Sequence, residues 1–134
     1  MILLDTSVLA RLADDRAETV LPYLRARTDE TWVTSSLVTF EFFRPAHRRQ
    51  SAHDVQTWLG QVLDGVEPFD ETAGVEAARL EAALSKQNRS LAMRDLLIAA
   101  HARALNGTLV TVDKGDFRPR PVQQLLDVDV LDVE

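Results

Sequence analysis

The sequence predicts an α/β fold in which a central, mostly parallel sheet is wrapped by helices on both faces. Short apolar runs, too short for helices, alternate with longer segments of helical periodicity. Several of these runs are nearly continuous in apolar residues, as buried parallel strands are, and stop at an acidic residue. The length of 134 residues fits one domain, so we expect residues 1–134 to fold around a single core.

Five segments are predicted to be strands because they are short, rich in apolar or β-branched residues and bounded by polar ones. The first opens the chain and ends at Asp5, the third ends at Asp70, and the fourth ends at Asp113. The last is at best a weak edge strand. The predicted strands are residues 1–4, 31–34, 66–69, 108–112 and 128–130.

Apolar residues recur at helical spacing between these runs. Two short helices are expected between residues 8 and 24, with Pro22 kinking or restarting the second. A helix after the second strand is expected to bend or end at Pro45. Ser90 is expected to cap the last long helix and Gly107 to stop it. The remaining helices are expected at residues 55–63, 73–88 and 91–106.

The composition is that of an ordinary globular protein, with 46% hydrophobic and 27% charged residues. No apolar run approaches the length of a membrane helix, and charged residues interrupt any secretory signal, so we expect a cytoplasmic protein. The absence of cysteine excludes disulfides and thiolate metal sites. With 15 basic and 21 acidic residues, the net charge is −6, so binding of a phosphate backbone requires a local basic patch or bound cations.

Four acidic residues from separate segments are expected to converge at the carboxyl edge of the sheet. Asp5 and Asp113 each follow a strand, and ligands bind at this edge in open α/β folds. Asp95 lies near the start of a helix that runs antiparallel to the fourth strand and so begins at the same edge. Glu41 lies about two turns into its helix, roughly 9 Å from the helix start at ~1.5 Å per residue, and its side chain can reach this edge.

Each acid also has a purely structural explanation. Asp5 can cap a helix, Asp113 can form a turn, Asp95 can stabilise a helix N-terminus, and Glu41 can pair with Arg44. Their joint placement favours a site. Two carboxylates ~4 Å apart repel by about 4 kcal/mol at an effective dielectric near 20, so a cluster of four needs protons or cations to neutralise it.

Divalent cations that prefer oxygen ligands account best for such a cluster. Mg²⁺ and Mn²⁺ bind carboxylates and water and bring phosphate oxygens into their coordination sphere. Zinc is disfavoured because the chain has no cysteine and its three histidines are scattered. One or two such ions can activate a water and stabilise a leaving oxygen, which suits phosphodiester hydrolysis. Thr6, Ser7 and Thr111 are expected to support the ligands or their waters by hydrogen bonds.

Four segments, in this order, resemble the PIN-domain ribonucleases, and specifically the VapC-type toxins of prokaryotic toxin–antitoxin pairs. Each segment is a weak motif alone, but together they are specific and span nearly the whole chain. They are residues 4–9 (LDTSVL), 36–44 (SLVTFEFFR), 94–102 (RDLLIAAHA) and 109–117 (LVTVDKGDF).

The resemblance implies a three-layer α/β/α sandwich and an endoribonuclease activity that depends on Mg²⁺ or Mn²⁺. It also implies a homodimer and a cognate antitoxin whose C-terminal segment covers the acidic site. Asp5, Glu41, Asp95 and Asp113 match the family's metal-binding and catalytic acids. Asp116 is a further metal ligand that the family pattern allows, and the choice between Asp113 and Asp116 stays open.

Basic residues close to these motifs are the best candidates for contacts with RNA phosphates, although a solvated surface explains them equally well. Arg94 directly precedes Asp95 and is expected to point outward or to contact RNA. The candidates are Arg44, Arg48, Arg49, Arg94 and Arg118, the last with its neighbour Arg120.

Other functions on a similar sheet fit less well. Phosphatases that form a phosphoaspartate carry an Asp-x-Asp pattern at the end of the first strand. This chain has Ser7 in place of the second acid. Receiver domains need neighbouring acids there and a lysine at a later strand end, which Lys114 matches poorly. The main alternative is a non-catalytic RNA- or protein-binding module, and the presence of all four acids favours catalysis over it.

Overall fold

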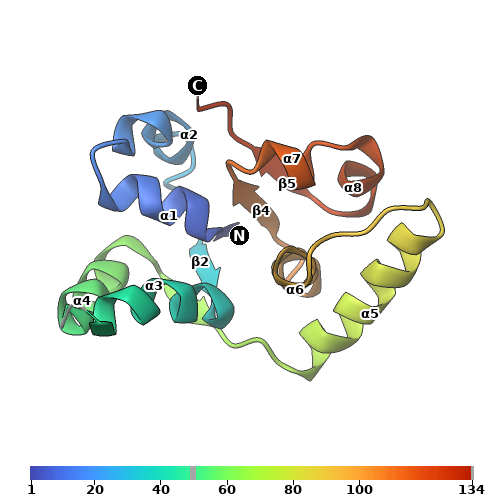
Figure 1. The fold of residues 1–134 in the computed structure, drawn as a ribbon. Coiled ribbons are helices and arrows are strands. Elements are labelled where there is room, and N and C mark those ends of the chain that lie inside the picture. The colour runs from blue at the N-terminus through green and yellow to red at the C-terminus, as the bar shows by residue number, and fades with distance from the viewer. Residues whose placement is uncertain (49–50, 134) are drawn as a thin grey trace.

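A computed structural model describes residues 1–48 and 51–133 of the chain and contains one five-stranded sheet with the order β3-β2-β1-β4-β5. Every paired strand is parallel to its neighbour, in agreement with the sequence prediction. Figure 1 shows the strands at the centre of the molecule. The strands are β1 (Ile2–Leu4), β2 (Trp32–Ser35), β3 (Gly65–Glu67), β4 (Thr108–Thr111) and β5 (Val128–Val130).

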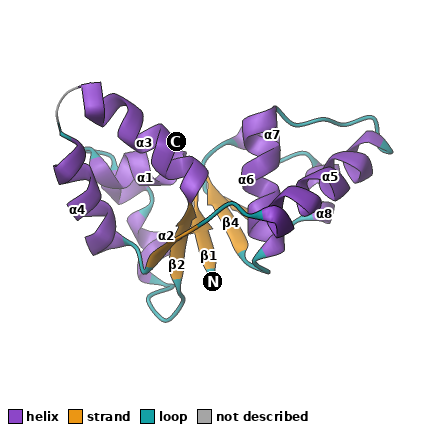
Figure 2. Cartoon of the chain, turned by 90° about the horizontal axis from the view of Figure 1, so that it is seen from below, coloured by secondary structure: helices purple, strands orange, loops and turns teal. Residues whose placement is uncertain are grey.

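The helices form two layers, one on each face of the sheet. The segments α1 to α4 cover one face and α5 to α8 cover the other, as Figures 1 and 2 both show. The fold is therefore the expected three-layer α/β/α sandwich. The helices are α1 (Thr6–Ala13), η1 (Ala17–Thr19, a 3₁₀ helix), α2 (Leu21–Arg25), α3 (Ser36–Arg48), α4 (Ala52–Val62), α5 (Glu71–Ser85), α6 (Met93–Ala104), α7 (Lys114–Phe117) and α8 (Arg120–Leu125).

The first residues of the chain form β1, the central strand of the sheet. Its three residues are all at most 1% exposed, since helices cover both faces of the sheet. In its pairing with β4, Leu4 lies opposite Val110, and the backbone N–H of Asp5 donates to the carbonyl of Val110 at 3.0 Å. The pairing thus places the carboxyl ends of β1 and β4 side by side, where both strands are followed by acids.

The end of α3 and the start of α6 differ from the sequence prediction. Pro45 does not end α3, which continues to Arg48, although proline cannot donate a hydrogen bond to the carbonyl of Glu41. Packing stabilises the turn of α3 beyond Pro45, where Ala46 is only 5% exposed. The start of α6 has Ala92 as its N-cap, without a side-chain hydrogen bond, so the prediction that Ser90 caps this helix is wrong.

The stop after α6 also uses a different residue from the one predicted. Asn106, not Gly107, has the left-handed backbone conformation, with φ of 54°. Asparagine tolerates this conformation better than most residues with a side chain. Gly107 is needed for another reason, because a Cβ atom there would lie 3.2 Å from the carbonyl oxygen of Met1. Its lack of a side chain lets the chain pass close to the start of β1.

The helices within residues 1–48 and 51–133 include none that is long and apolar enough to cross a membrane.

Candidate active site

Asp5 is a buried carboxylate at the junction between β1 and α1. Its side chain is 3% exposed. Oδ1 accepts a hydrogen bond from the backbone N–H of Thr6 at 2.8 Å, so Asp5 caps α1 as the structural explanation expected. Oδ2 accepts from the hydroxyl of Thr111, the last residue of β4, at 2.9 Å. Capping therefore accounts for only part of the role of Asp5, whose carboxylate is held in one orientation by α1 and β4.

Glu41 reaches the same edge of the sheet from α3. Its Oε1 accepts a hydrogen bond from the Thr6 hydroxyl at 2.7 Å, across 35 positions in the sequence. Burial alone would raise the pKa of Glu41, but hydrogen bonds from Arg94 and Thr6 outweigh burial and lower the pKa below its ordinary value. Glu41 is therefore held in its charged form, as a metal-binding or cation-binding carboxylate must be.

Arg94 lies at the centre of these acids. Its Nη2 donates to Asp5 Oδ1 at 2.5 Å, to Glu41 Oε1 at 2.7 Å and to the Thr6 hydroxyl at 2.8 Å. Its Nη1 donates to Asp95 Oδ1 at 3.0 Å, and its Nε lies 3.1 and 3.0 Å from the two oxygens of Glu41. One guanidinium thus binds three carboxylates from β1–α1, α3 and α6.

The structure places Arg94 among the acids, so the expectation that its side chain points outward is wrong, while a contact with RNA stays a prediction. Burial would lower the pKa of Arg94, but its bonds to Glu41 and Asp5 raise the pKa above its already high value, so the cation is permanent. One signal in the sequence could have indicated this. Arg94 is a cation in the first turn of a helix that was already expected to begin beside several acids.

A second group of acids adjoins the first through Asp95. Asp95, Asp113 and Asp116 each offer an oxygen, and these oxygens lie within 4.8 Å of one another. Asp113 caps α7 by accepting a hydrogen bond from the backbone N–H of Asp116 at 3.2 Å, which fixes both residues at the end of β4. The structure thus places Asp113 and Asp116 in the same cluster, where the sequence left a choice between them.

The protonation of Asp95 differs from that of Glu41. Burial and hydrogen bonding to the Asp116 carboxyl raise the pKa of Asp95, while Arg94 opposes this increase. A raised pKa is the expected response of carboxylates that share a small space without enough positive charge. A cation bound among these three acids would relieve this repulsion, to which Arg94 contributes one positive charge through its pair with Asp95.

The hydroxyls of Thr111 and Ser7 connect β4 to α1 next to these acids. The Thr111 hydroxyl donates to Asp5, accepts from the backbone N–H of Asp113 at 3.1 Å and lies 3.3 Å from the Ser7 hydroxyl. Ser7 in turn accepts from the backbone N–H of Val112 at 3.2 Å. Thr6 and Thr111 thus contact the acids directly, and Ser7 contacts Thr111 and the backbone next to Asp113.

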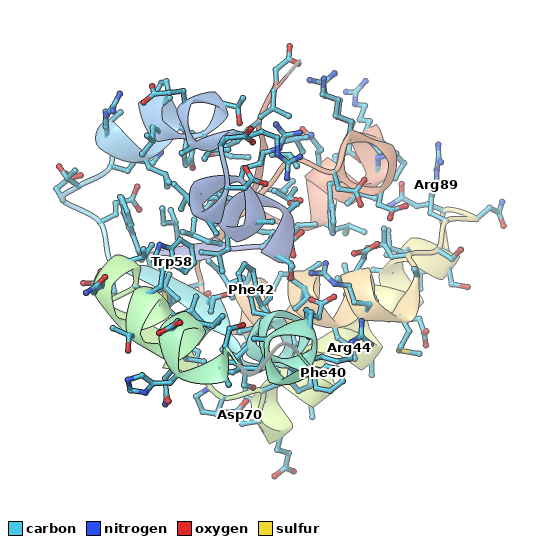
Figure 3. All side chains as sticks on the ribbon, turned by 60° about the vertical axis from the view of Figure 1, so that its left-hand side comes forward. Phe40, Phe42, Arg44, Trp58, Asp70 and Arg89 are labelled. Atoms are coloured by element: carbon cyan, nitrogen blue, oxygen red, sulfur yellow. The ribbon has the colours of Figure 1, made fainter. Side chains whose placement is uncertain are left out.

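The basic candidates for RNA contacts have different surroundings. Arg44 is exposed on α3, with its guanidinium carbon 5.4 Å from the ring centre of Phe40, which is itself 62% exposed. Figure 3 shows these two side chains next to each other. Arg118 and Arg120 are also exposed, just after α7. The side chains of Arg48 and Arg49 lie outside the described part of the chain.

The donor set fits a hard divalent cation. All the side chains that meet here, apart from Arg94, offer oxygen atoms, and among the described residues the only candidate metal cluster is Asp95, Asp113 and Asp116. Oxygen-only sites of this kind suit Mg²⁺ or Mn²⁺. His101, which lies on the same helix as Asp95, is buried, and its Nδ1 is 2.8 Å from the Ser35 hydroxyl.

The fold and this arrangement of acids agree with a comparison to protein families. The model of the PIN domain family matches residues 2–119 of the chain. The chain therefore belongs to the PIN domain family. A search of curated protein sequences gives no match.

Solved structures of toxin–antitoxin proteins have a similar fold. A chain of VapBC2 from Rickettsia felis, solved with a promoter DNA fragment, is 24% identical, with a TM-score of 0.76 over 98% of this chain and 100% of that one. A chain of VapBC-1 from nontypeable Haemophilus influenzae is 23% identical, with a TM-score of 0.76 over 97% and 98%. VapC20 from Mycobacterium tuberculosis, described as a toxin that cleaves the sarcin–ricin loop, is 20% identical, with a TM-score of 0.56 over 81% and 87%.

Proposed function

We propose that this protein is a metal-dependent endoribonuclease that hydrolyses RNA phosphodiester bonds as the toxin of a VapBC-type pair. One observation carries the proposal: acids from separate segments of a PIN domain meet at the carboxyl edge of the sheet. Three of their oxygens lie within 4.8 Å of one another. Acids grouped solely for stability would repel one another, whereas acids that hold a cation must be close.

The acids would have different roles in the proposed metal site. Asp95, Asp113 and Asp116 would hold the ion, with Asp5 and Glu41 completing the pocket. Mg²⁺ or Mn²⁺ bound there would activate a water and stabilise charge on the phosphate. Asp5 needs no reorganisation for this task, because hydrogen bonds from Thr6 and Thr111 already fix both of its oxygens.

Further proposals concern the substrate and partners. We infer an RNA substrate, a homodimer, a cognate antitoxin and a cytoplasmic location from the resemblance to VapC-type toxins. Support for an antitoxin beside the acids comes from a cavity of about 330 Å³ that adjoins Thr6 and Glu41. Apolar side chains, including Phe42 and Val55, also line this cavity, so it offers contacts for a peptide segment that approaches the acids.

Cleavage of RNA tests this function. The purified protein should cleave single-stranded RNA with added Mg²⁺ or Mn²⁺ and stop when EDTA is added. Asp5→Asn should lower the rate by about a hundredfold or more, because the several kcal/mol supplied by a metal depend on the acids that hold it. Asparagine is an equally good helix cap, so this variant should keep its fold.

Two results would contradict the proposal in different ways. Cleavage that persists in EDTA would exclude the metal-dependent mechanism. A well-folded protein that binds RNA but cleaves none, with either ion, would instead favour a non-catalytic binding module.

A further inference from the structure

The guanidinium of Arg94 lies between three carboxylates. It contacts Asp5 at 2.5 Å, Glu41 at 2.7 Å and Asp95 at 3.0 Å. The same carboxylates belong to the pocket assigned above to a divalent ion. The two cations would compete, because an ion bound among all of these acids would need some of the same carboxylate oxygens and the space between them.

The charges at the pocket favour exchange between the two cations. Arg94 brings one positive charge to three acids, and Asp113 and Asp116 add further acidic groups next to Asp95. The pocket thus stays short of positive charge with Arg94 in place. A divalent ion would supply two charges and would suit the all-oxygen donor set.

The Arg94 side chain can also leave the acidic pocket toward solvent. It lies in the first turn of α6 and is 34% exposed, whereas the carboxylate of Asp5 is only 3% exposed. Its long, flexible stem can turn toward solvent without moving the helix. The neighbouring Met93 is 64% exposed, so open space adjoins this end of α6.

We propose that Arg94 is an internal counter-ion that holds the acidic pocket together without metal and is displaced when a divalent ion binds. This inference rests on the metal site of the proposed function and adds a control on it. The apparent metal affinity is then the intrinsic affinity multiplied by the fraction of molecules in which Arg94 has left the pocket. The alternative is a permanent bridge, with the ion held by Asp95, Asp113 and Asp116 beside a fixed Arg94.

Titration of Mn²⁺ into the protein without RNA, measured by calorimetry, tests whether Arg94 opposes metal binding. Arg94→Gln should bind Mn²⁺ about tenfold or more tightly than the native protein, because no internal cation competes. Arg94→Lys should fall between them, since lysine is a single point charge and cannot bridge three acids as a planar fork does.

Arg89→Gln is the matched control. It removes the same charge from Arg89, an exposed arginine at the margin of the molecule in Figure 3. Its Mn²⁺ affinity should equal that of the native protein, because screening weakens distant surface charges. Equal or weaker affinity in Arg94→Gln than in Arg89→Gln would overturn the counter-ion role.

Thermal unfolding with and without Mn²⁺ gives a second readout. Without metal, Arg94→Gln should melt at a lower temperature than native protein, because three acids then face one another without their cation. Added Mn²⁺ should raise the melting temperature of Arg94→Gln more than that of native protein, as tighter binding to the folded state requires. A smaller Mn²⁺ shift in the variant would contradict the proposal.

A measurement on native protein keeps the test decisive even if Arg94→Gln does not fold. The NMR signal of the Arg94 Nε–H group, which faces Glu41 at 3.0 Å, should change position and lose protection from exchange when Mg²⁺ is added. An unchanged signal at saturating Mg²⁺ would show a permanent bridge.

The same measurements distinguish failure of the counter-ion role of Arg94 from failure of the proposed metal site. Binding of Mn²⁺ with equal affinity by native protein and Arg94→Gln would overturn only the role of Arg94. Failure of every variant to bind Mn²⁺ would overturn the metal site itself.

Discussion

Arg94 and Glu41 join the two helical layers of the molecule, with Nε of Arg94 lying 3.0 and 3.1 Å from the two oxygens of Glu41. Glu41 belongs to α3 on one face of the sheet, and Arg94 belongs to α6 on the other (Figure 1). The contact therefore passes over the carboxyl edge, where β1 ends at Asp5. Formation of the acidic pocket depends on both layers and on the sheet between them.

The first prediction concerns the two acids that follow β4. Asp113→Asn and Asp116→Asn should each weaken Mn²⁺ binding by about tenfold or more, because each removes a charge from the cluster. Asparagine can still accept the hydrogen bond that caps α7, so Asp113→Asn should fold normally. Calorimetry of Mn²⁺ binding measures this effect. Native affinity in either variant would remove that residue from the site.

The next prediction concerns Thr111, which supports the acids by hydrogen bonds and is not itself expected to bind the metal. Thr111→Val keeps the shape of the side chain but removes the hydroxyl that donates to Asp5 and accepts from the N–H of Asp113. We expect about a 10- to 100-fold loss of metal affinity or activity, which is typical when a ligand loses its hydrogen-bond partner.

Thr108→Val is the matched control for Thr111→Val, because it makes the same change at the opposite end of β4. The Thr108 hydroxyl donates to Asp127 at the surface, at 2.7 Å. Metal affinity should be unaffected in this control. An equal loss in both variants would mean that general damage to β4, and not the contact with Asp5, causes the effect.

Arg44 tests the proposed contact with RNA. Arg44→Gln should weaken binding of single-stranded RNA, and the slope of log affinity against log salt concentration should decrease in magnitude by about one phosphate contact, or ~0.7. Binding is best measured with Asp5→Asn as the background, which prevents cleavage. Arg89→Gln is the control for net charge, and an identical slope in both variants would count against Arg44 as a contact.

Because His101 is buried, we expect the stability of the fold to depend on pH. Burial lowers the pKa of His101 below its ordinary value of 6.5, so near neutral pH the folded state keeps this ring uncharged. Below about pH 6.5 the unfolded chain binds a proton that the folded chain does not. The contribution of this histidine to stability is therefore lost progressively as the pH falls through 6.5 toward the lower folded-state pKa.

Denaturant unfolding between pH 7 and pH 5 measures this dependence. His101→Asn should be less stable at pH 7, since it leaves part of a buried site unfilled, but its stability should fall less steeply toward pH 5. The control is His53→Gln, because His53 is exposed on α4. A slope unchanged in His101→Asn would show that other groups cause the loss of stability in acid.

The parts of the site that follow strands could be predicted from the sequence for a simple reason. Asp5 and Asp113 directly follow apolar runs, and parallel strands bring their carboxyl ends to one edge. Asp95 and Glu41 could be placed because helical rise fixes how far each lies from the start of its helix. Backbone periodicity was sufficient for these four residues.

The direction of long side chains could not be predicted in the same way. Arg94 turns inward because it pairs with Asp5 and Glu41 from two other segments as well as with its neighbour Asp95, and only the folded chain brings these acids together. Pro45 likewise remains inside α3 because packing beyond it holds the helix, and Asn106 takes the left-handed position that its glycine neighbour was expected to take. Each case depends on contacts that form only in the folded chain.

Crystals grown with Mn²⁺ and measured for anomalous scattering test the central claim most directly. We predict an anomalous peak between the carboxylates of Asp95, Asp113 and Asp116, within reach of Asp5, and the Arg94 guanidinium turned away from Glu41. A well-ordered crystal at saturating Mn²⁺ with no peak among these acids, and with Arg94 still bound to all three of its carboxylates, would contradict the account.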